Sequence, residues 1–378
     1  MIDLDSLSDF GLSWLEASGP NADIVLSTRV RLARNLQGHA FSPRIGDDER
    51  LRILGSVQRA AEQGTLLGDG VSVDVASLPE LSRRVLLERH LVSRELVGEG
   101  APGPHTGAGL IVGPAEEAGL MVNEEDHLRL QSLMSGLRLR EAYGQVDALD
   151  EELGERLPMA FHHEFGYLTS CPTNVGTGLR ASVLVHLPGL VLTKEIGKVL
   201  QGIGQVGLTF RGLYGEGSEV VGNFFQISNQ TTLGKPEEDL IDHLHKIVRQ
   251  VIQYEMQART VLMREAPAVM EDKIWRAYGL LRYARSLSFE EVMNLLSGVR
   301  LGVSMKLLSS LSVYTLNKIM IYTQPAHLEQ AAGRSLTDQE NDLQRAAYVR
   351  RTLESESDLE PGGRNGPDDV DTDQSKAE

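Results

Sequence analysis

The sequence of 378 residues lacks several features that would define its class, beginning with cysteine. Its single cysteine, Cys171, excludes a disulfide within the chain and suits a reducing cytoplasm. The N-terminal string MIDLDSLSDF is acidic and has no apolar stretch of the kind that a signal peptide needs. No apolar run reaches the length of a membrane span. These absences predict a soluble cytoplasmic protein.

Positive charge is also scarce. The chain has 37 Lys and Arg against 53 Asp and Glu, a net charge of -16, which argues against binding to nucleic acid or to an anionic membrane. It contains no G-x-x-x-x-G-K-[ST] motif, so a P-loop enzyme is disfavoured. His162, His163 and Glu164 are consecutive, but neighbouring side chains in a strand point to opposite faces. We therefore predict no metal site.

The first two thirds of the chain mix strand and helix patterns. A strand is expected at 23–35, a hairpin at 108–123 with its loop at 113–117, and a strand pair at 205–217 and 220–230. Helices are expected at 46–63, with an apolar side made of Leu51, Ile53 and Leu54, and at 77–91, opened by a Ser77/Glu80 capping box.

From Pro236 onward the pattern is helical. One apolar stripe predicts a long first helix, and the capping boxes Ser288/Glu291 and Thr337/Glu340 open two later ones; the stripe consists of Leu240, Leu244, Ile247, Val248 and Val251. We divide the chain into a leader at 1–20 with a turn at Trp14 and Leu15, a catalytic domain at 21–255, a helical domain at 256–353 and a disordered acidic tail at 354–378.

Arginine recurs beside small or polar residues in four strings: STRVR, NEEDHLR, GLRAS and RGLYGE. Guanidinium groups grip phosphate oxygens in paired hydrogen bonds, so these arginines are candidates for a triphosphate cradle: Arg29, Arg31, Arg129, Arg180 and Arg211. The alternative for each arginine taken alone is a solvated surface charge.

Carboxylates and the lone thiol are the other chemical candidates. Glu124, Glu125 and Asp126 form an acidic run, and Glu216 closes the RGLYGE loop, although such residues are commonly solvated turns. Cys171, in TSCPTNVG, is either a small buried hydrophobe or a thiolate favoured by nearby arginines.

Together, STRVR, VNEEDHLR, CPTNVGTGLRAS and RGLYGEGSE followed by FQISNQ resemble the phosphagen kinases, in that family's order, over about residues 20–255. Small-molecule members have a long helical domain before STRVR, which here begins at Ser27, and typically read RGTRGEHTE at the last string. About a hundred helical residues follow instead, so the chain resembles the bacterial protein-arginine kinases. The resemblance implies an α+β fold, an antiparallel sheet flanked by helices, followed by a C-terminal helical domain.

The resemblance also implies roles for individual residues. Glu125 and Glu216 match the paired substrate carboxylates, Cys171 matches the active-site thiol, and His90 matches a nucleotide contact less closely. Arg129 and three segments would bind ATP with Mg²⁺; the segments comprise Ser27, Thr28, Arg29, Val30 and Arg31; Arg180, Ala181, Ser182, Val183 and Leu184; and Arg211, Gly212, Leu213, Tyr214, Gly215 and Glu216.

Function and partners follow from the same resemblance as expectations. The chain is expected to phosphorylate arginine in proteins, in stress response and in marking proteins for degradation. Relatives act on a heat-shock repressor, serve a Clp protease and need a zinc-containing activator; a homodimer is also compatible with the resemblance. Two alternatives stay open: a kinase for a small guanidino metabolite and a non-catalytic phosphoarginine-binding adaptor.

A last string, NDLQRA, resembles the RDxxRA motif that forms a regulatory phosphoarginine pocket in the bacterial protein-arginine kinases. Asp342, Arg345 and Ala346 match the motif, but Asn341 replaces its first arginine. We expect a weakened pocket. The alternative is an ordinary helix surface on which Asp342 and Arg345, three residues apart, pair with each other.

Overall fold

The computed structural model describes residues 12–41, 44–100, 103–212 and 221–357. Its centre is an antiparallel sheet with strand order β2-β3-β4-β5-β1-β8-β10-β9. The strands are β1 Val25–Arg34, β2 Val71–Asp74, β3 Gly109–Val112, β4 Ala118–Val122, β5 Leu128–Ser135, β8 Leu179–His186, β9 Leu208–Gly212 and β10 Phe224–Asn229, and a separate hairpin pairs β6 Phe161–His162 with β7 Gly166–Tyr167.

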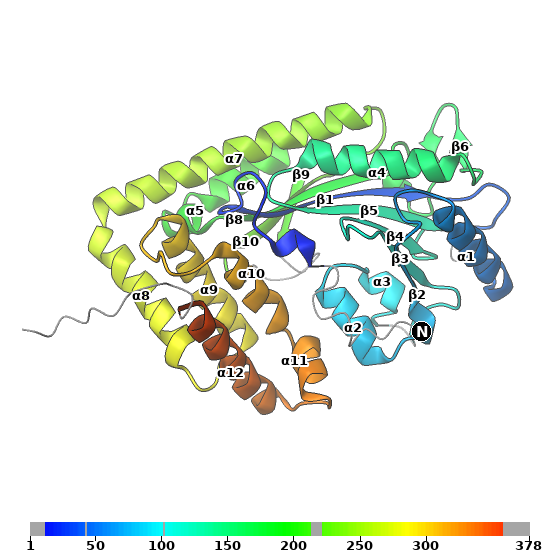
Figure 1. Cartoon of the computed structure of the whole chain (residues 1–378). Coiled ribbons are helices and arrows are strands. Elements are labelled where there is room, and N and C mark those ends of the chain that lie inside the picture. The colour runs from blue at the N-terminus through cyan, green and yellow to red at the C-terminus, as the bar shows by residue number, and fades with distance from the viewer. Residues whose placement is uncertain (1–11, 42–43, 101–102, 213–220, 358–378) are drawn as a thin grey trace, which may run out of the picture.

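Helices lie on both sides of this sheet (Figure 1). They are α1 Asp47–Glu62, α2 Glu80–Glu88, α3 Arg94–Val97, α4 Leu139–Gly154, α5 Pro188–Leu192, α6 Ile196–Gln205, α7 Glu237–Glu265, α8 Pro267–Tyr283, α9 Phe289–Ser304, α10 Val313–Tyr322, α11 Pro325–Ala332 and α12 Asp338–Ser357. Short 3-10 turns are η2 Ser13–Leu15, η3 Val75–Ser77 and η4 Pro172–Asn174. An antiparallel sheet flanked by helices, with a C-terminal helical region, confirms the predicted fold class.

One face of the sheet is apolar and is covered by α4 and α7. Alternate residues of β1, such as Val30 and Leu32, point into this core and are at most 1% exposed. The predicted stripe of α7 packs on the same core: Leu240, Leu244, Val248 and Val251 are buried, and Ile247 is partly buried at its edge. The expected helix is therefore confirmed.

The C-terminal helices α8, α9, α10 and α12 form a second core that reaches the opposite face of the sheet. Trp14 and Leu15 of η2 pack into it, as do Leu133 of β5 and Leu184 of β8. Leu133 lies opposite Arg29 in the β1–β5 register, and paired residues share a face. The helical region thus occupies part of the face that carries arginines.

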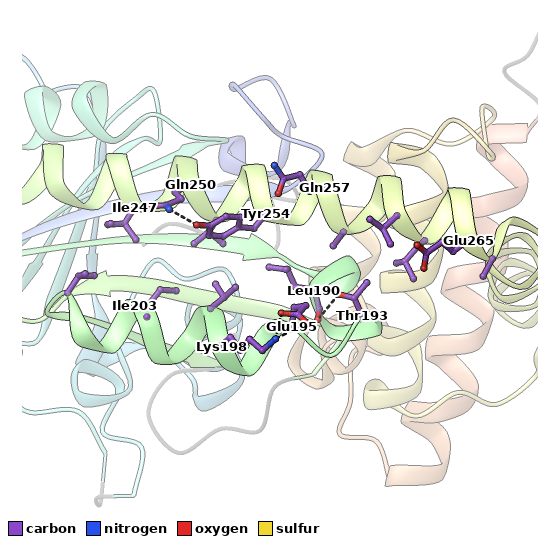
Figure 2. Close-up of a pocket in the computed structure, with 18 residues that line it drawn as sticks. Leu190, Thr193, Glu195, Lys198, Ile203, Ile247, Gln250, Tyr254, Gln257 and Glu265 are labelled. Carbon is purple, nitrogen blue, oxygen red and sulfur yellow. Dashed lines mark hydrogen bonds and ion pairs between the residues drawn. The ribbon is translucent and has the colours of Figure 1, made fainter.

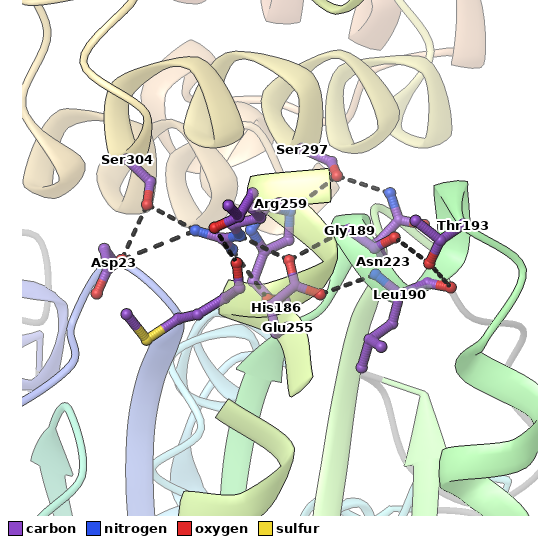
Figure 3. Close-up of polar contacts among 12 residues, drawn as sticks. Asp23, His186, Gly189, Leu190, Thr193, Asn223, Glu255, Arg259, Ser297 and Ser304 are labelled. Atoms are coloured by element: carbon purple, nitrogen blue, oxygen red, sulfur yellow. Dashed lines mark hydrogen bonds and ion pairs between the residues drawn. The ribbon is translucent and has the colours of Figure 1, made fainter. Parts of the chain in front are cut away.

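A buried ion pair ties the two regions together (Figure 3). Glu255 of α7 accepts the backbone N–H groups of Gly189 and Leu190, each at 2.9 Å, and the Nε of Arg259 at 2.6 Å. Arg259 also donates to the hydroxyl of Ser304 in α9 at 2.6 Å. Buried charges persist only with such partners. The domain boundary predicted near 255 lies inside this continuous helix, which ends at Glu265.

Local signals at helix ends were mostly confirmed. Ser288 accepts the N–H of Glu291, and Thr337 and Glu340 exchange hydrogen bonds as a capping box. The Ser77/Glu80 capping box is wrong: α2 begins at Glu80 behind the extended Pro79, and Ser77 Oγ donates to the carbonyl of Asp74.

Two further expectations need correction. Leu51 of α1 is 50% exposed, unlike the buried Ile53 and Leu54. The start predicted for the tail is too early, because α12 continues to Ser357 and Glu356 accepts the N–H of Ser312 at 2.7 Å. Within the described part of the chain, no helix is both long and apolar enough to cross a membrane.

Candidate functional site

The strand register gathers the predicted arginines on the face of the sheet opposite α4 and α7, which we call the arginine face. Arg31 of β1 lies opposite Arg180 of β8, and Arg129 of β5 lies opposite Ala33, two residues further along β1. Arg29 precedes Arg31 by two residues and therefore shares its face. Arg211 of β9 extends the same face at the sheet edge, through its pairing with Gln226 and the pairing of Gln226 with Leu184.

Crowding of like charge perturbs these guanidinium groups. Burial lowers the pKa of Arg29 to about 10, and the charges of Arg129 and Arg180 act in the same direction. Burial, followed by the neighbouring arginines, holds the pKa of Arg31 well below its usual value. The buried Nε of Arg31 has no hydrogen-bond partner among the described residues. Such a cluster is suited to an anion with several charges, which would supply the missing acceptors.

Glu124 has a structural part in this face. Its carboxylate pairs with Arg129 and accepts hydrogen bonds from Ser93 Oγ at 2.6 Å and from the N–H of Glu125 at 2.8 Å. Burial opposes the charge of Arg129, but the contact with Glu124 outweighs it and raises the pKa of Arg129. Glu124 thereby fixes one wall of the cradle.

A small pocket lies where the arginine face meets the N-terminal segment. It brings together five predicted residues, Ser27, Arg29, His90, Ser182 and Leu184, with three that the sequence interpretation missed, Trp14, Leu133 and Gln226. His90 adopts a left-handed backbone conformation with φ 61°, and its ring centroid lies 5.5 Å from that of Trp14. Burial, helped by Arg29, lowers the pKa of His90 to about 3, so this imidazole is neutral.

Not every residue of the predicted nucleotide segments presents its side chain here. Thr28 donates to the carbonyl of Gly136 at 2.6 Å, and Val30, Ala181 and Val183 are in the core under α4 and α7. A ligand on the arginine face meets only the backbone of these residues because strand side chains alternate. Gly212 ends β9. Leu213, Tyr214, Gly215 and Glu216 lie outside the described residues.

The structure brings Glu125 and Cys171 together. The Cys171 thiol lies close enough to the Glu125 carboxylate to lower its pKa, and its Sγ is 3.0 Å from Thr173 Oγ1. Burial, with the charges of Glu124 and Asp126, raises the pKa of Glu125, while Arg129 and the thiol oppose the shift. A carboxylate that is partly buried, close to cationic groups and shifted toward neutrality is suited to accepting a proton.

Arg34 is a further residue that the sequence interpretation missed. It is 2% exposed, pairs with Asp150 at 2.7 Å and donates to the carbonyl of Thr177 at 2.9 Å. Its guanidinium also lies 3.4 Å from the centre of the Tyr167 ring. Tyr167 and Thr177 bound the loop that carries Cys171. Arg34 lies three residues after Arg31, so strand alternation turns it to the opposite face, where the fold supplies Asp150 as its partner.

The predicted regulatory residues lie on α12. Arg345 is 2% exposed and donates to the carbonyls of Thr323 at 2.8 Å and Leu287 at 2.9 Å, and to Asp342 at 2.6 Å. Asn341 is buried, and its Oδ1 has no hydrogen-bond partner within the described ranges. Ala346 is fully buried in the second core. Asp342 and Arg345 therefore pair as the ordinary-helix alternative expects, but Arg345 and Asn341 are buried and do not lie on a helix surface.

A cavity larger than the small pocket described above lies elsewhere (Figure 2). It is a mostly apolar groove between α6 and α7, lined for example by Val199, Ile203, Ile247 and Tyr254. Ile203 and Ile247 belong to the helix-covered core, so this groove lies on the other side of the sheet from the arginines. It has no part in the site described above.

The fold is that of the phosphotransferases that act on guanidino groups, and comparisons with known proteins show the family. The family model "ATP:guanido phosphotransferase, C-terminal catalytic domain" matches residues 55–258, and "Protein-arginine kinase McsB C-terminal domain" matches residues 267–363. A taurocyamine kinase structure from Schistosoma mansoni aligns with TM-score 0.53 and 25% identity, over 63% of this chain and 33% of that one. A lombricine kinase structure gives TM-score 0.55 and 24% identity, over 64% and 70%.

Similar sequences are more specific. A protein-arginine kinase of Moorella thermoacetica is 45% identical over 343 residues, which span 90% of this chain and 97% of that one. One from Symbiobacterium thermophilum is 46% identical over 343 residues, 90% and 96% of the two chains. The chain belongs to the ATP:guanido phosphotransferase family, in its protein-arginine kinase branch.

Proposed function

We propose that this enzyme transfers the terminal phosphoryl group of ATP to arginine side chains of other proteins. The observation that carries the proposal is one continuous site. Four crowded arginines, Arg29, Arg31, Arg129 and Arg180, lie on one sheet face, and the Glu125–Cys171 pair lies beside Arg129. The first part suits a polyphosphate and the second a guanidinium group.

The acceptor explains why a carboxylate is needed. The pKa of arginine exceeds 12, so reaching neutral guanidine at pH 7 costs roughly 7–9 kcal/mol. Glu125 holds the guanidinium in a fixed plane and accepts its proton while the nitrogen–phosphorus bond forms and the bond to the leaving ADP oxygen breaks. The Cys171 thiol, which lies beside the Glu125 carboxylate, helps to orient it.

The arginine face acts on the other reactant. Arg29, Arg31, Arg129 and Arg180 neutralise phosphate charge and align the triphosphate, which is most of what phosphoryl transfer requires. Mg²⁺ carried by the nucleotide would add charge neutralisation at the phosphates. Arg31 is the residue whose unsatisfied Nε most directly indicates a bound anion.

The wider setting of the enzyme is also part of the proposal and rests on family resemblance. It comprises a cytoplasmic location, a role in stress response and protein degradation, and the partners expected above. The division into catalytic and helical domains is supported by the two family models, which leave only residues 259–266 unmatched between them.

One assay tests the main proposal. Purified enzyme, ATP, Mg²⁺ and an unstructured arginine-containing protein should yield phosphoarginine, detected by mass spectrometry under neutral conditions because the phosphoramidate is acid-labile. Parallel reactions with free arginine and creatine test the metabolite-kinase alternative. Transfer to a small guanidino compound at a higher kcat/KM than to protein would overturn the assignment.

A phosphoarginine pocket at α12 is proposed separately. Arg345 already donates its hydrogen bonds to the carbonyls of Thr323 and Leu287, so a pocket at this place would bind phosphate weakly. Asn341→Arg would add one charged donor, and we expect phosphoarginine to bind it roughly 10-fold or more tightly than the wild type. Calorimetric titration of both proteins decides this; equal affinities would mean that the segment is only structural.

A further inference from the structure

Two segments that lie far apart in the sequence meet at Asp126. The first is the tight turn 123–127, in which Asn123 has φ 56° and its N–H donates to the carbonyl of His127 at 2.9 Å. This turn presents Glu125. The second is the loop 168–178 between β7 and β8, which presents Cys171 just before η4. The Asp126 side chain is 3% exposed and lies between them.

One oxygen of Asp126 makes the contact. Its Oδ1 accepts the backbone N–H of Ser170 at 2.6 Å and the Nδ2 of Asn35 at 2.6 Å. Asn35, which directly follows β1, also accepts the N–H of His127 at 2.9 Å through its own Oδ1. The turn, the loop and the end of β1 are thus joined by three buried hydrogen bonds, two of them short, in a place of low dielectric where such bonds are strong.

The hydrogen bond between Ser170 and Asp126 matters because of where these two residues lie in the chain. Glu125 directly precedes Asp126, and Cys171 directly follows Ser170. The hydrogen bond therefore joins the two residues adjacent to the carboxylate and the thiol. Other anchors hold the far side of the loop, where Thr232 Oγ1 contacts the carbonyls of Thr173 and Val175, each at 2.8 Å.

We propose that Asp126 is a positioning residue, which sets the thiol of Cys171 against the carboxylate of Glu125 by holding the backbone of Ser170. The inference rests on the proposed function of the site and assigns a role to the one carboxylate of the acidic run that the mechanism does not use. Asp126 acts through the geometry of its Oδ1 acceptor. Its negative charge is not needed, and it transfers no proton.

This proposal predicts different activities for two substitutions at Asp126. If Asp126 were a proton-accepting carboxylate, both substitutions would lose activity. Asp126→Asn keeps an Oδ1 that accepts both hydrogen bonds, whereas Asp126→Ala removes the acceptor. We expect kcat for a protein acceptor to fall about 10-fold or more in Asp126→Ala, which loses the hydrogen bonds to Ser170 and Asn35, and to stay within about threefold in Asp126→Asn. KM for ATP should stay within about twofold in both.

The matched control is Glu164→Ala, which removes an exposed carboxylate from the turn between β6 and β7 and should leave kcat unchanged. In a Cys171→Ser background, Asp126→Ala should cost clearly less than in the wild type, because its effect passes through the thiol. If Asp126→Ala does not fold, Asp126→Asn decides alone. A folded Asp126→Asn that loses more than about tenfold in kcat overturns the proposal, as does a fully active Asp126→Ala.

A readout independent of catalysis distinguishes this inference from the proposed function. Hydrogen–deuterium exchange of a peptide covering residues 168–175 should be faster in Asp126→Ala and unchanged in Asp126→Asn. If the wild type transfers no phosphate, the proposed function fails, and the exchange data still test the link. If the wild type is active but exchange is the same in all variants, Asp126 does not hold the loop.

Discussion

Arg31 on the sheet and Arg345 on α12 are both largely withdrawn from water, yet their surroundings differ. Arg345 donates to two carbonyls and a carboxylate. Arg31 lies among other arginines, and its Nε has no hydrogen-bond partner among the described residues. Burial lowers the pKa of both side chains, but Asp342 counters the shift at Arg345 while neighbouring arginines deepen it at Arg31.

The difference teaches how to tell two kinds of buried arginine apart. A guanidinium whose donors end on the protein's own acceptors stabilises the fold, because removing it would leave those acceptors unsatisfied. A guanidinium crowded by like charges destabilises the fold locally, so its presence indicates a ligand. By this measure the catalytic face is built for an anion, and the α12 segment is built mainly for packing.

The largest effect on catalysis is expected for Glu125, which lies where the arginine face meets the arginine acceptor. Glu125→Gln keeps the size of the side chain but removes the proton acceptor, so kcat should fall roughly 10²- to 10⁴-fold. ATP binding, measured by calorimetry, should remain nearly unchanged because the arginines are intact. Normal turnover at saturating ATP combined with weaker nucleotide binding would show that Glu125 acts on ATP, and would contradict its assignment to the arginine acceptor.

Arg31→Ala tests the catalytic half of the comparison. It removes one phosphate contact, so KM for ATP should rise roughly 10- to 150-fold. The melting temperature should stay the same or rise, since the substitution relieves repulsion among the arginines. An ATP titration indistinguishable from that of the wild type would contradict the phosphate cradle.

Arg345→Ala tests the structural half and should give the opposite pattern. The carbonyls of Thr323 and Leu287 lose their donor, and the free energy of unfolding should fall by about 1–3 kcal/mol. Urea denaturation measures the loss, and KM for ATP at a permissive temperature should be unchanged. A variant as stable as the wild type would show that these hydrogen bonds do not hold α12 in place.

The smallest effect concerns pH. Burial and two neighbouring acids raise the pKa of Glu125 above its ordinary value of 4.5. A base must be deprotonated, so kcat/KM should decline as pH falls through the raised value, and the acidic limb should lie above that of an unperturbed glutamate. A pH–rate profile that stays flat down to 4.5 would show that Glu125 is not the base.

Much of the site was predictable because its signals are local. The string around Arg29 carries both a strand pattern and the residue types that bind phosphate, whereas the strands β5 and β8, which carry Arg129 and Arg180, were not predicted. The hairpin at 108–123 and the long helix after Pro236 also follow from short-range periodicity. The start of α2 was missed because the Ser77/Glu80 pattern looks the same whether or not Pro79 sets the first turn.

The sequence by itself determined the chemical types: arginines for phosphate, a carboxylate run for the guanidinium, and one thiol. Only the tertiary structure decided which of these residues contact one another and therefore which role each has. Strand register placed Arg31 opposite Arg180, while Arg34 turned inward to bond Asp150. In the turn 123–127, Glu124 pairs with Arg129, and Glu125 lies beside Cys171. The contacts of Arg31, Arg34 and Glu125 join segments that are far apart in the chain, which no local pattern encodes because the side-chain period sets faces and not partners.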